Sequence, residues 1–221
     1  MTTTGRREAK KAQKRADLLA AALQLFLEEG YQGASIERIA AAADVARGTF
    51  YLYFADKESI FQDVIDDLLD PVMDALEACR DRLEISTCVE ETQHEYEALR
   101  GTLVGILIEH APTALLYFRE QRGAGRMGDW LRERQERIDS FVTDMIRSLI
   151  RRQLLRECEP VVVARSIIGA IERLTFDFLS GRGAGDPLTV GAEVERFFAV
   201  GVLTGIGIET RQPQQMSVEE P

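Results

Sequence analysis

The chain has 221 residues, of which 45% are apolar, and a formal net charge of −10 at pH 7. This apolar content supports a packed core and excludes an intrinsically disordered protein. The net negative charge argues against nucleic-acid binding over the whole surface, but the charge is uneven, because the first fifteen residues hold six Lys or Arg and one acidic residue.

The sequence contains no arrangement typical of catalysis or metal binding. Its three cysteines and two histidines share no disulfide or metal-ligand spacing, and no glycine-rich phosphate loop or nucleophile–base pair stands out. The longest late uncharged run, residues 197–208, is short of the ~20 residues that span a bilayer. We therefore expect a cytoplasmic protein that is not an enzyme, needs no cofactor or metal and does not enter a membrane.

Helical periodicity runs through almost every segment, and no sustained alternation predicts a strand, so we expect an all-α fold. Gly30, Ser35 and Asp56 are expected to cap the first, second and fourth helices. Pro112 and Pro160 suit the first turns of later helices. The predicted helices cover approximately residues 8–29, 35–43, 46–54, 56–81, 90–109, 112–121, 127–155, 160–180 and 189–208.

The third predicted helix, residues 46–54, has one face suited to a core. On a helical wheel Ala46, Phe50 and Phe54 lie on that face. The other side combines a glycine, which costs up to about 1 kcal/mol in a helix, with one charge and several exposed apolar or aromatic side chains. An isolated solvated helix does not favour such a surface, so the surface indicates a binding partner.

DNA accounts for each member of this surface. Gly48 lets the backbone approach closely, and Arg47 can donate to guanine or phosphate. Thr49 and Tyr51 can bind phosphate oxygens, and Leu52 can contact a thymine methyl group or a sugar.

Lys57 adds to this pattern. A cation in the first turn of a helix opposes the helix dipole, whereas a phosphate bound there interacts favourably with both the free amides and the lysine. Taken singly, the tyrosines could be core residues and Lys57 a solvated charge. Together, a basic N-terminal segment, a helix, a tight turn at Asp44 and Val45 and a short helix match the helix-turn-helix plan.

Over residues 15–61 the chain resembles the tetracycline-repressor family, on the stretch RADLLAAALQLFLEEGYQGASIERIAAAADVARGTFYLYFADKESIF. The resemblance implies that Ser35 caps the first helix of the motif near a phosphate, that Tyr53 lies on the recognition helix, and that Lys57 binds the DNA backbone. The candidate DNA-binding residues are Ser35, Arg47, Gly48, Thr49, Tyr51, Leu52, Tyr53, Lys57, Lys10, Lys11, Lys14 and Arg15.

Two departures from the family pattern bear on the motif. Asp44 stands where the turn usually has glycine, and aspartate accepts a positive φ less readily. The second helix carries Glu37 and alanines at 41–43, where many members have basic or polar residues. We therefore expect few phosphate contacts from that helix.

We divide the chain into a DNA-binding domain over 1–56, a ligand-binding and dimerisation domain over 57–210 and a disordered tail over 211–221. The resemblance implies that the second domain forms a homodimer and binds a small molecule.

The last two predicted helices support a dimer independently. The helix at 160–180 is apolar around most of its circumference, so it must be buried on two sides, and the last helix is similar. Two such helices from each subunit would form a four-helix bundle, although a helix pair within a monomer core is the alternative. The candidate interface residues are Val163, Ile167, Ile171, Leu174, Phe178, Phe197, Gly201 and Gly205.

The middle helices carry aromatic and apolar residues that either line a ligand cavity or belong to the core. They are Tyr117, Phe118, Trp130, Phe141, Met145 and Phe176. Arg119, Arg122 and Arg126 either bind an anionic head group, as in a fatty-acyl-type effector, or are solvated.

These patterns favour a ligand-responsive transcriptional regulator, most simply a repressor. It would bind a palindromic operator in double-stranded DNA as a dimer and be released by a small hydrophobic effector. The alternative is an all-helical protein-interaction module without effector control of DNA binding.

Overall fold

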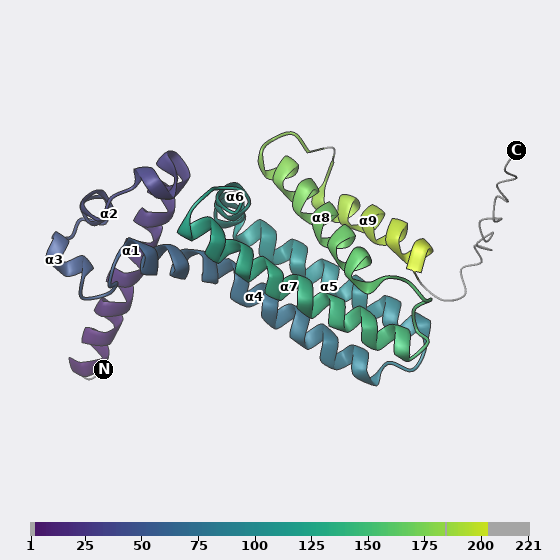
Figure 1. The fold of residues 1–221 in the computed structure, drawn as a ribbon. Helices are drawn as coiled ribbons and strands as arrows, with labels where there is room; N and C mark the ends of the chain where they lie inside the picture. Colours follow the sequence, from purple (N-terminus) through teal and green to yellow (C-terminus); the bar gives the residue numbers. More distant parts are fainter. Residues whose placement is uncertain (1–2, 184, 203–221) are drawn as a thin grey trace, which may run out of the picture.

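The structure, a computed structural model, describes residues 3–183 and 185–202. Within these ranges every regular element is a helix, so the predicted all-α fold is confirmed. The helices are α1 (Thr3–Gly33), α2 (Ile36–Ala42), α3 (Arg47–Phe50), α4 (Lys57–Ile85), α5 (Val89–Glu109), α6 (Ala111–Glu120), α7 (Arg126–Arg151), α8 (Pro160–Leu179) and α9 (Pro187–Val202). Figure 1 shows α1–α3 at one end of an elongated molecule and α4 running from them into the bundle of later helices.

The first three helices pack around a shared set of buried side chains. Phe26 on α1, Ile39 on α2 and Phe50 on α3 are fully buried. Ser35 precedes α2, and its hydroxyl oxygen accepts a hydrogen bond from the backbone amide of Arg38 at 3.4 Å. The predicted cap of the second helix is therefore confirmed.

The turn between α2 and α3 depends on a positive backbone angle. Asp44 has a φ of 52°, the conformation that glycine adopts more easily. The turn is closed by the amide of Val45, which donates to the carbonyl of Ala40 at 2.9 Å. Aspartate thus supplies the geometry of the tight turn between the two helices.

The predicted helix over 46–54 is shorter than expected. Regular α-helix covers Arg47–Phe50, and the following residues continue in tighter turns. The amide of Leu52 donates to the carbonyl of Thr49, and that of Tyr53 donates to the carbonyl of Phe50. These i→i+3 bonds are of the 3₁₀ type, which commonly ends short helices.

Gly30 bends the end of α1. Its φ of 73° and ψ of 169° are not helical, yet helix continues beyond it to Gly33. The predicted helix end therefore marks a kink rather than a terminus. The last carbonyls of a helix have no intrahelical donor, so this corner needs partners from elsewhere in the chain.

Helix α4 joins the two ends of the molecule. Asp56 caps it, and a reciprocal pair of hydrogen bonds with Ser59 completes a capping box. Its 29 residues give a length of about 43 Å. Pro71 lies inside the helix, between Leu69 of one buried cluster and Leu76 of a second.

Phe61 stands at the centre of the first buried cluster. Its ring lies 5.2 Å from that of Phe26, 4.9 Å from that of Tyr31 and 6.5 Å from that of Trp130 on α7. The predicted boundary between 1–56 and 57–210 falls at the start of α4, and this aromatic cluster packs across it. The helix-turn-helix unit thus shares its core with the first part of α4 and with α7.

The C-terminal predictions are covered only in part. The last predicted helix corresponds to α9, whereas Gly205 and the predicted tail at 211–221 lie outside the described residues. Within those residues, no single helix is long and apolar enough to cross a membrane. Helices α5 and α6 together meet the length and composition test, but they are bent by 89° at their junction.

The aromatic junction yields a stability prediction. Phe61→Ala removes a fully buried ring and should lower the free energy of unfolding by about 3 to 5 kcal/mol. Ile85→Ala is the control, because Ile85 is 78% exposed at the end of the same helix, and it should change stability by less than about 0.5 kcal/mol. Urea unfolding followed by circular dichroism measures both. Equal losses in the two variants would contradict the role given to Phe61.

Candidate nucleic-acid interface and ligand cavity

Helix α3 and the turns after it present one buried and one exposed side. Phe50 and Phe54 are buried against α1 and α4 and fix the orientation of the segment. On the outer side Tyr51 is 47% exposed and Leu52 is 75% exposed, beside the exposed Gly48. The helical wheel predicts this division for the aromatic residues, whereas Ala46, which the wheel places on the core face, is exposed at the N-cap of α3.

Arg47 lies along this outer side. Its Nη1 atom is 3.0 Å from Oε1 of Glu37 on α2, and its Nη2 atom is 3.5 Å from the hydroxyl oxygen of Tyr51. The hydrogen bond to Tyr51, followed by the charge of Glu37, raises the pKa of Arg47. Exposed ion pairs contribute little, at most about 1 kcal/mol. The guanidinium can therefore exchange these partners for a phosphate or a base edge.

Gly48 has no packing reason to be glycine. A Cβ atom built on it would meet nothing within 4 Å, and its φ is not in the positive range. Because glycine weakens a helix, this position is costly for the free protein. A partner that approaches the backbone of α3 closely explains the missing side chain.

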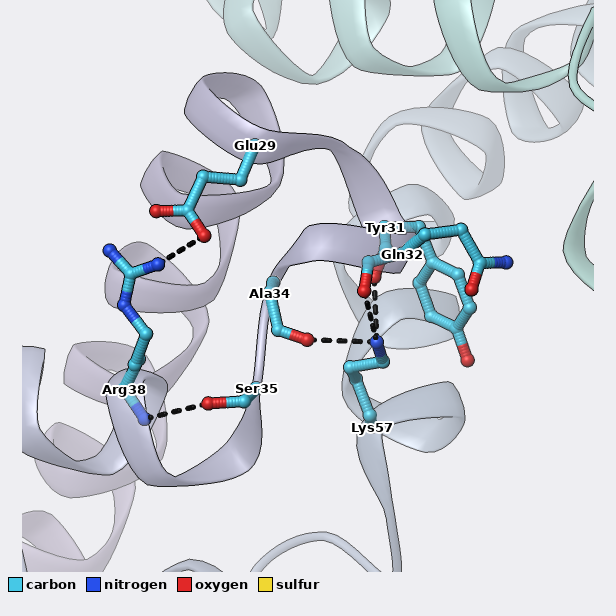
Figure 2. Close-up of polar contacts among 7 residues, drawn as sticks. All are labelled: Glu29, Tyr31, Gln32, Ala34, Ser35, Arg38 and Lys57. Carbon is cyan, nitrogen blue, oxygen red and sulfur yellow. Dashed lines mark hydrogen bonds and ion pairs between the residues drawn. The ribbon is translucent and has the colours of Figure 1, made fainter.

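Lys57 lies at the corner between α1, α2 and α4 (Figure 2). Its Nζ atom donates to the carbonyl oxygens of Tyr31 at 2.7 Å, Ala34 at 2.8 Å and Gln32 at 3.4 Å, and it lies 4.5 Å from the centroid of the Tyr31 ring. Burial lowers the pKa of Lys57. The predicted phosphate contact remains a prediction. The partners in the structure are backbone carbonyls, which the sequence pattern did not indicate.

The remaining DNA-binding candidates differ in their surroundings. Thr49, Tyr53 and Ser35 are half-buried on or beside the motif. The basic segment is helical, because α1 begins at Thr3. Within α1, Lys10 and Lys11 are exposed, Lys14 is half-buried, and Arg15 pairs with Asp63 of α4 while its guanidinium lies 5.4 Å from the Phe54 ring centroid.

A cavity of about 410 Å³ lies among α4, α5, α6, α7, α8 and α9. Its lining is largely aliphatic and aromatic, as in sites that bind small hydrophobic molecules. Three of the predicted ligand-binding residues line it, namely Tyr117, Phe118 and Met145.

The other three predicted ligand-binding residues do not line the cavity. Trp130 packs against Phe61, Phe141 lies beneath Arg80, and Phe176 lies between Arg122 and Arg182. The predicted residues on the middle helices thus fall into two groups: three line the cavity, and three pack against other side chains of the protein.

The predicted dimer residues on α8 all belong to the cavity lining. Val163, Ile167, Ile171, Leu174 and Phe178 line the cavity. On α9, Phe197 is 76% exposed, and Gly201 lies in the helix. A helix that is apolar around most of its circumference satisfies either environment, so the sequence alone did not separate cavity from interface.

The arginines suggested for an anionic head group bind protein groups instead, and none of the three lines the cavity. Arg119 donates to the carbonyl of Leu27 at 2.8 Å and to that of Phe26, and Arg126 pairs with Glu58 at 3.1 Å. Arg122 donates to the carbonyl of Phe118 at 3.4 Å.

A short exposed helix that follows a tight turn after α2 is the arrangement of the helix-turn-helix class of DNA-binding units. Residues 18–64 match the bacterial regulatory proteins of the tetR family. The DNA-binding end of the chain is therefore a tetR-family domain, and the chain as a whole resembles transcriptional regulators of this family.

Relatives agree with this assignment. The HTH-type transcriptional regulator YdgC of Bacillus subtilis is 26% identical over 89% of this chain and 96% of its own length. The HTH-type transcriptional repressor BepR of Brucella suis is 43% identical over 27% of this chain and 29% of its own length. The crystal structure of the transcriptional regulator FadR from Bacillus subtilis, in complex with stearoyl-CoA, is 18% identical and has a TM-score of 0.67, covering 84% of this chain and 98% of that one.

Gly48 provides a direct test of the interface. Gly48→Ala should leave stability unchanged or raise it by up to about 1 kcal/mol, because the new methyl group meets no atom within 4 Å. The affinity for target DNA should fall at least about tenfold, because the methyl group obstructs close approach. Gly101→Ala on α5 is the matched control, since a Cβ atom there also meets nothing within 4 Å. Thermal unfolding and fluorescence anisotropy measure the two effects. Unchanged DNA affinity in Gly48→Ala would contradict the close approach.

Proposed function

We propose that this chain is a cytoplasmic repressor that binds a palindromic operator as a homodimer and leaves it when a small hydrophobic effector enters the cavity. The observation that best supports the proposal is the physical connection between cavity and DNA-binding unit. Two of the helices that line the cavity, α4 and α6, also bind the end of α1.

Helix α6 makes the shorter connection. Tyr117 and Phe118 line the cavity, and the next residue, Arg119, donates to the carbonyls of Leu27 and Phe26 just before the kink in α1. Displacement of the two aromatic side chains by an effector therefore acts on the residue that holds α1.

Helix α4 makes the longer connection. Leu68, Leu69, Val72 and Leu76 contribute to the cavity lining, and Lys57 at the start of the helix binds the corner before α2. The recognition helices of a dimer read half-sites roughly 34–36 Å apart, so a change of a few ångströms in their separation spoils simultaneous docking. An effector that binds better to the wrongly spaced conformation would release the operator.

The nature of the cavity supports a long-chain effector. Its volume of about 410 Å³ falls within the range of about 300–1,000 Å³ common for ligand sites, and its lining is mostly aliphatic. The FadR complex with stearoyl-CoA is one case in which a regulator of this fold binds a molecule with a long acyl chain.

Exposed apolar side chains on the last two helices support the homodimer. Such side chains on a monomer surface commonly mark an interface. They are Val162 on α8 and Leu188 and Phe197 on α9. We therefore assign the dimer to the exposed sides of these helices rather than to the cavity side of α8.

Effector control is tested with an uncharged ten-carbon probe, 1-decanol, and a palindromic duplex from the DNA flanking the coding region. The probe should raise the operator dissociation constant by about 5- to 150-fold, the usual range for such coupling. Operator should weaken probe binding by the same factor, because linkage is reciprocal. Anisotropy and calorimetry measure the two sides.

Val142→Phe is the variant for this test, because Val142 lines the cavity and a larger side chain fills it. It should blunt the response to decanol while leaving operator binding intact. Ile85→Phe, at an exposed position outside the cavity, should respond as the parent does. Identical decanol affinity with and without bound operator would refute effector control through this cavity.

The dimer is tested at Phe197. Phe197→Glu should convert a two-chain particle into one near the chain mass of 24.8 kDa, because a charge buried without a partner in an interface is strongly destabilising. Ile85→Glu, at another exposed apolar position, should leave the mass unchanged. Light scattering at micromolar concentration measures both. An unmutated protein that is monomeric there would rule out the dimer.

A further inference from the structure

One end of the apolar cavity is polar. Tyr117 on α6, Gln135 on α7 and Glu172 on α8 all line the cavity. The hydroxyl of Tyr117 donates to Oε1 of Gln135 at 2.5 Å, and Nε2 of Gln135 donates to Oδ1 of Asp139 at 2.9 Å. Tyr117 and Gln135 are thus already hydrogen-bonded, and the charged side chain that lines the cavity close to Tyr117 is the carboxylate of Glu172.

The charged residues of the lining differ in how their charge is balanced. These residues are Arg100, Glu172, Asp177 and Arg182. Arg182 pairs with Asp177 at 3.4 Å, and Arg100 is itself engaged in an interaction within the protein. Its side-chain carbons also lie under Gly191 of α9, where an added Cβ atom would be 3.3 Å from Cδ of Arg100. Both arginines thus already interact with other groups of the protein.

Glu172 has weaker compensation. Among the described residues no cation lies within ion-pair distance of its carboxylate, and the side chain that lies close to it from α6's C-terminal end, Gln121, is neutral. Arg122 is the nearby cation, but its guanidinium lies over the Phe176 ring, 5.3 Å from the centroid, and donates to the carbonyl of Phe118.

Asp139 adds a second negative charge close to Glu172. Arg165 balances Asp139 in part, at 3.5 Å, from the solvent side. Burial, followed by the charge of Asp139, raises the pKa of Glu172 despite the opposing effect of Arg122. The ionised carboxylate is therefore poorly stabilised by the protein and would gain from a cation inside the cavity.

We propose that Glu172 determines which effectors the cavity accepts. The effector is an amphipathic molecule whose apolar chain lies along α4, α5 and α7. Its polar group is a cation that donates hydrogen bonds, such as an amine, and this group lies beside Glu172 and Tyr117. The same chain ending in a carboxylate is disfavoured, because it places two negative charges together in a largely apolar space. This inference rests on the proposed effector cavity and specifies the chemistry of its ligand.

Three probes with the same ten-carbon chain test the inference: decylammonium, 1-decanol and decanoate, each below its micelle-forming concentration at pH 7.5. Calorimetry on the full chain should show decylammonium binding at least about tenfold more tightly than decanoate, with decanol between them. Glu172→Gln should reduce the ratio between the two charged probes to within about threefold, because the charge that distinguishes them is removed. Circular dichroism and thermal unfolding check that the variant is folded.

Glu193→Gln is the matched control. Glu193 is an exposed carboxylate on α9 that pairs with Arg196 and does not line the cavity, so the preference for decylammonium should persist in this variant. Equal affinities for the three probes, tighter binding of decanoate, or a preference that survives Glu172→Gln would each overturn the inference. If decanol binds and releases the operator while the head groups are not distinguished, the proposed function stands and only the inference fails. If none of the three probes binds, both fail.

Discussion

A half-buried ammonium group at the start of α4 holds the DNA-binding unit against the rest of the molecule. Lys57 is the first residue of α4, where the helix dipole disfavours a cation. The carbonyls of Tyr31, Gln32 and Ala34 offset this cost, because each accepts a hydrogen bond from the ammonium in the corner before α2. The same contact satisfies carbonyls at the end of α1 that have no intrahelical donor. The end of α1, the segment before α2 and the start of α4 are thereby held as one body.

Arg119 performs a similar role one turn earlier on α1. It binds the carbonyls of Phe26 and Leu27, on the other side of the kink at Gly30. One short stretch of backbone thus receives a cation from α4 and another from α6. The position of the helix-turn-helix unit depends on both helices, and both line the cavity.

Local features of the fold were predictable from sequence because neighbouring residues determine them. The caps at Ser35 and Asp56 and the positive φ at Asp44 depend on side chains within a few positions. The exposed side of α3 was predictable for a related reason. A glycine beside exposed apolar side chains is unfavourable on a solvated helix, so this composition indicates a partner. The open space around Gly48 agrees with that reasoning.

Features that depend on distant partners were not predictable. The carbonyls that bind Lys57 and Arg119 carry no signal in the identity of their residues, since every residue has one. The largely apolar surface of α8 predicts burial but does not specify the neighbour, so the sequence did not indicate that residues such as Ile167, assigned to a dimer, line the cavity. Glu172 was not predicted as a site residue for the same reason. A carboxylate among the few polar residues of an apolar helix is ordinary until its neighbours in the fold are known.

Pro71 marks the point at which α4 bends most easily. It has no amide hydrogen to donate, so the helix lacks one backbone hydrogen bond at this point and bends there at the least cost. The proline lies between the cluster that contains Leu69 and the cluster that contains Leu76. From Pro71 to Lys57 the helix is a lever arm of about 21 Å, so a bend of about 10° moves its end by about 4 Å. A small angular strain near the cavity is thereby amplified into a displacement comparable with the reach of a hydrogen bond to DNA.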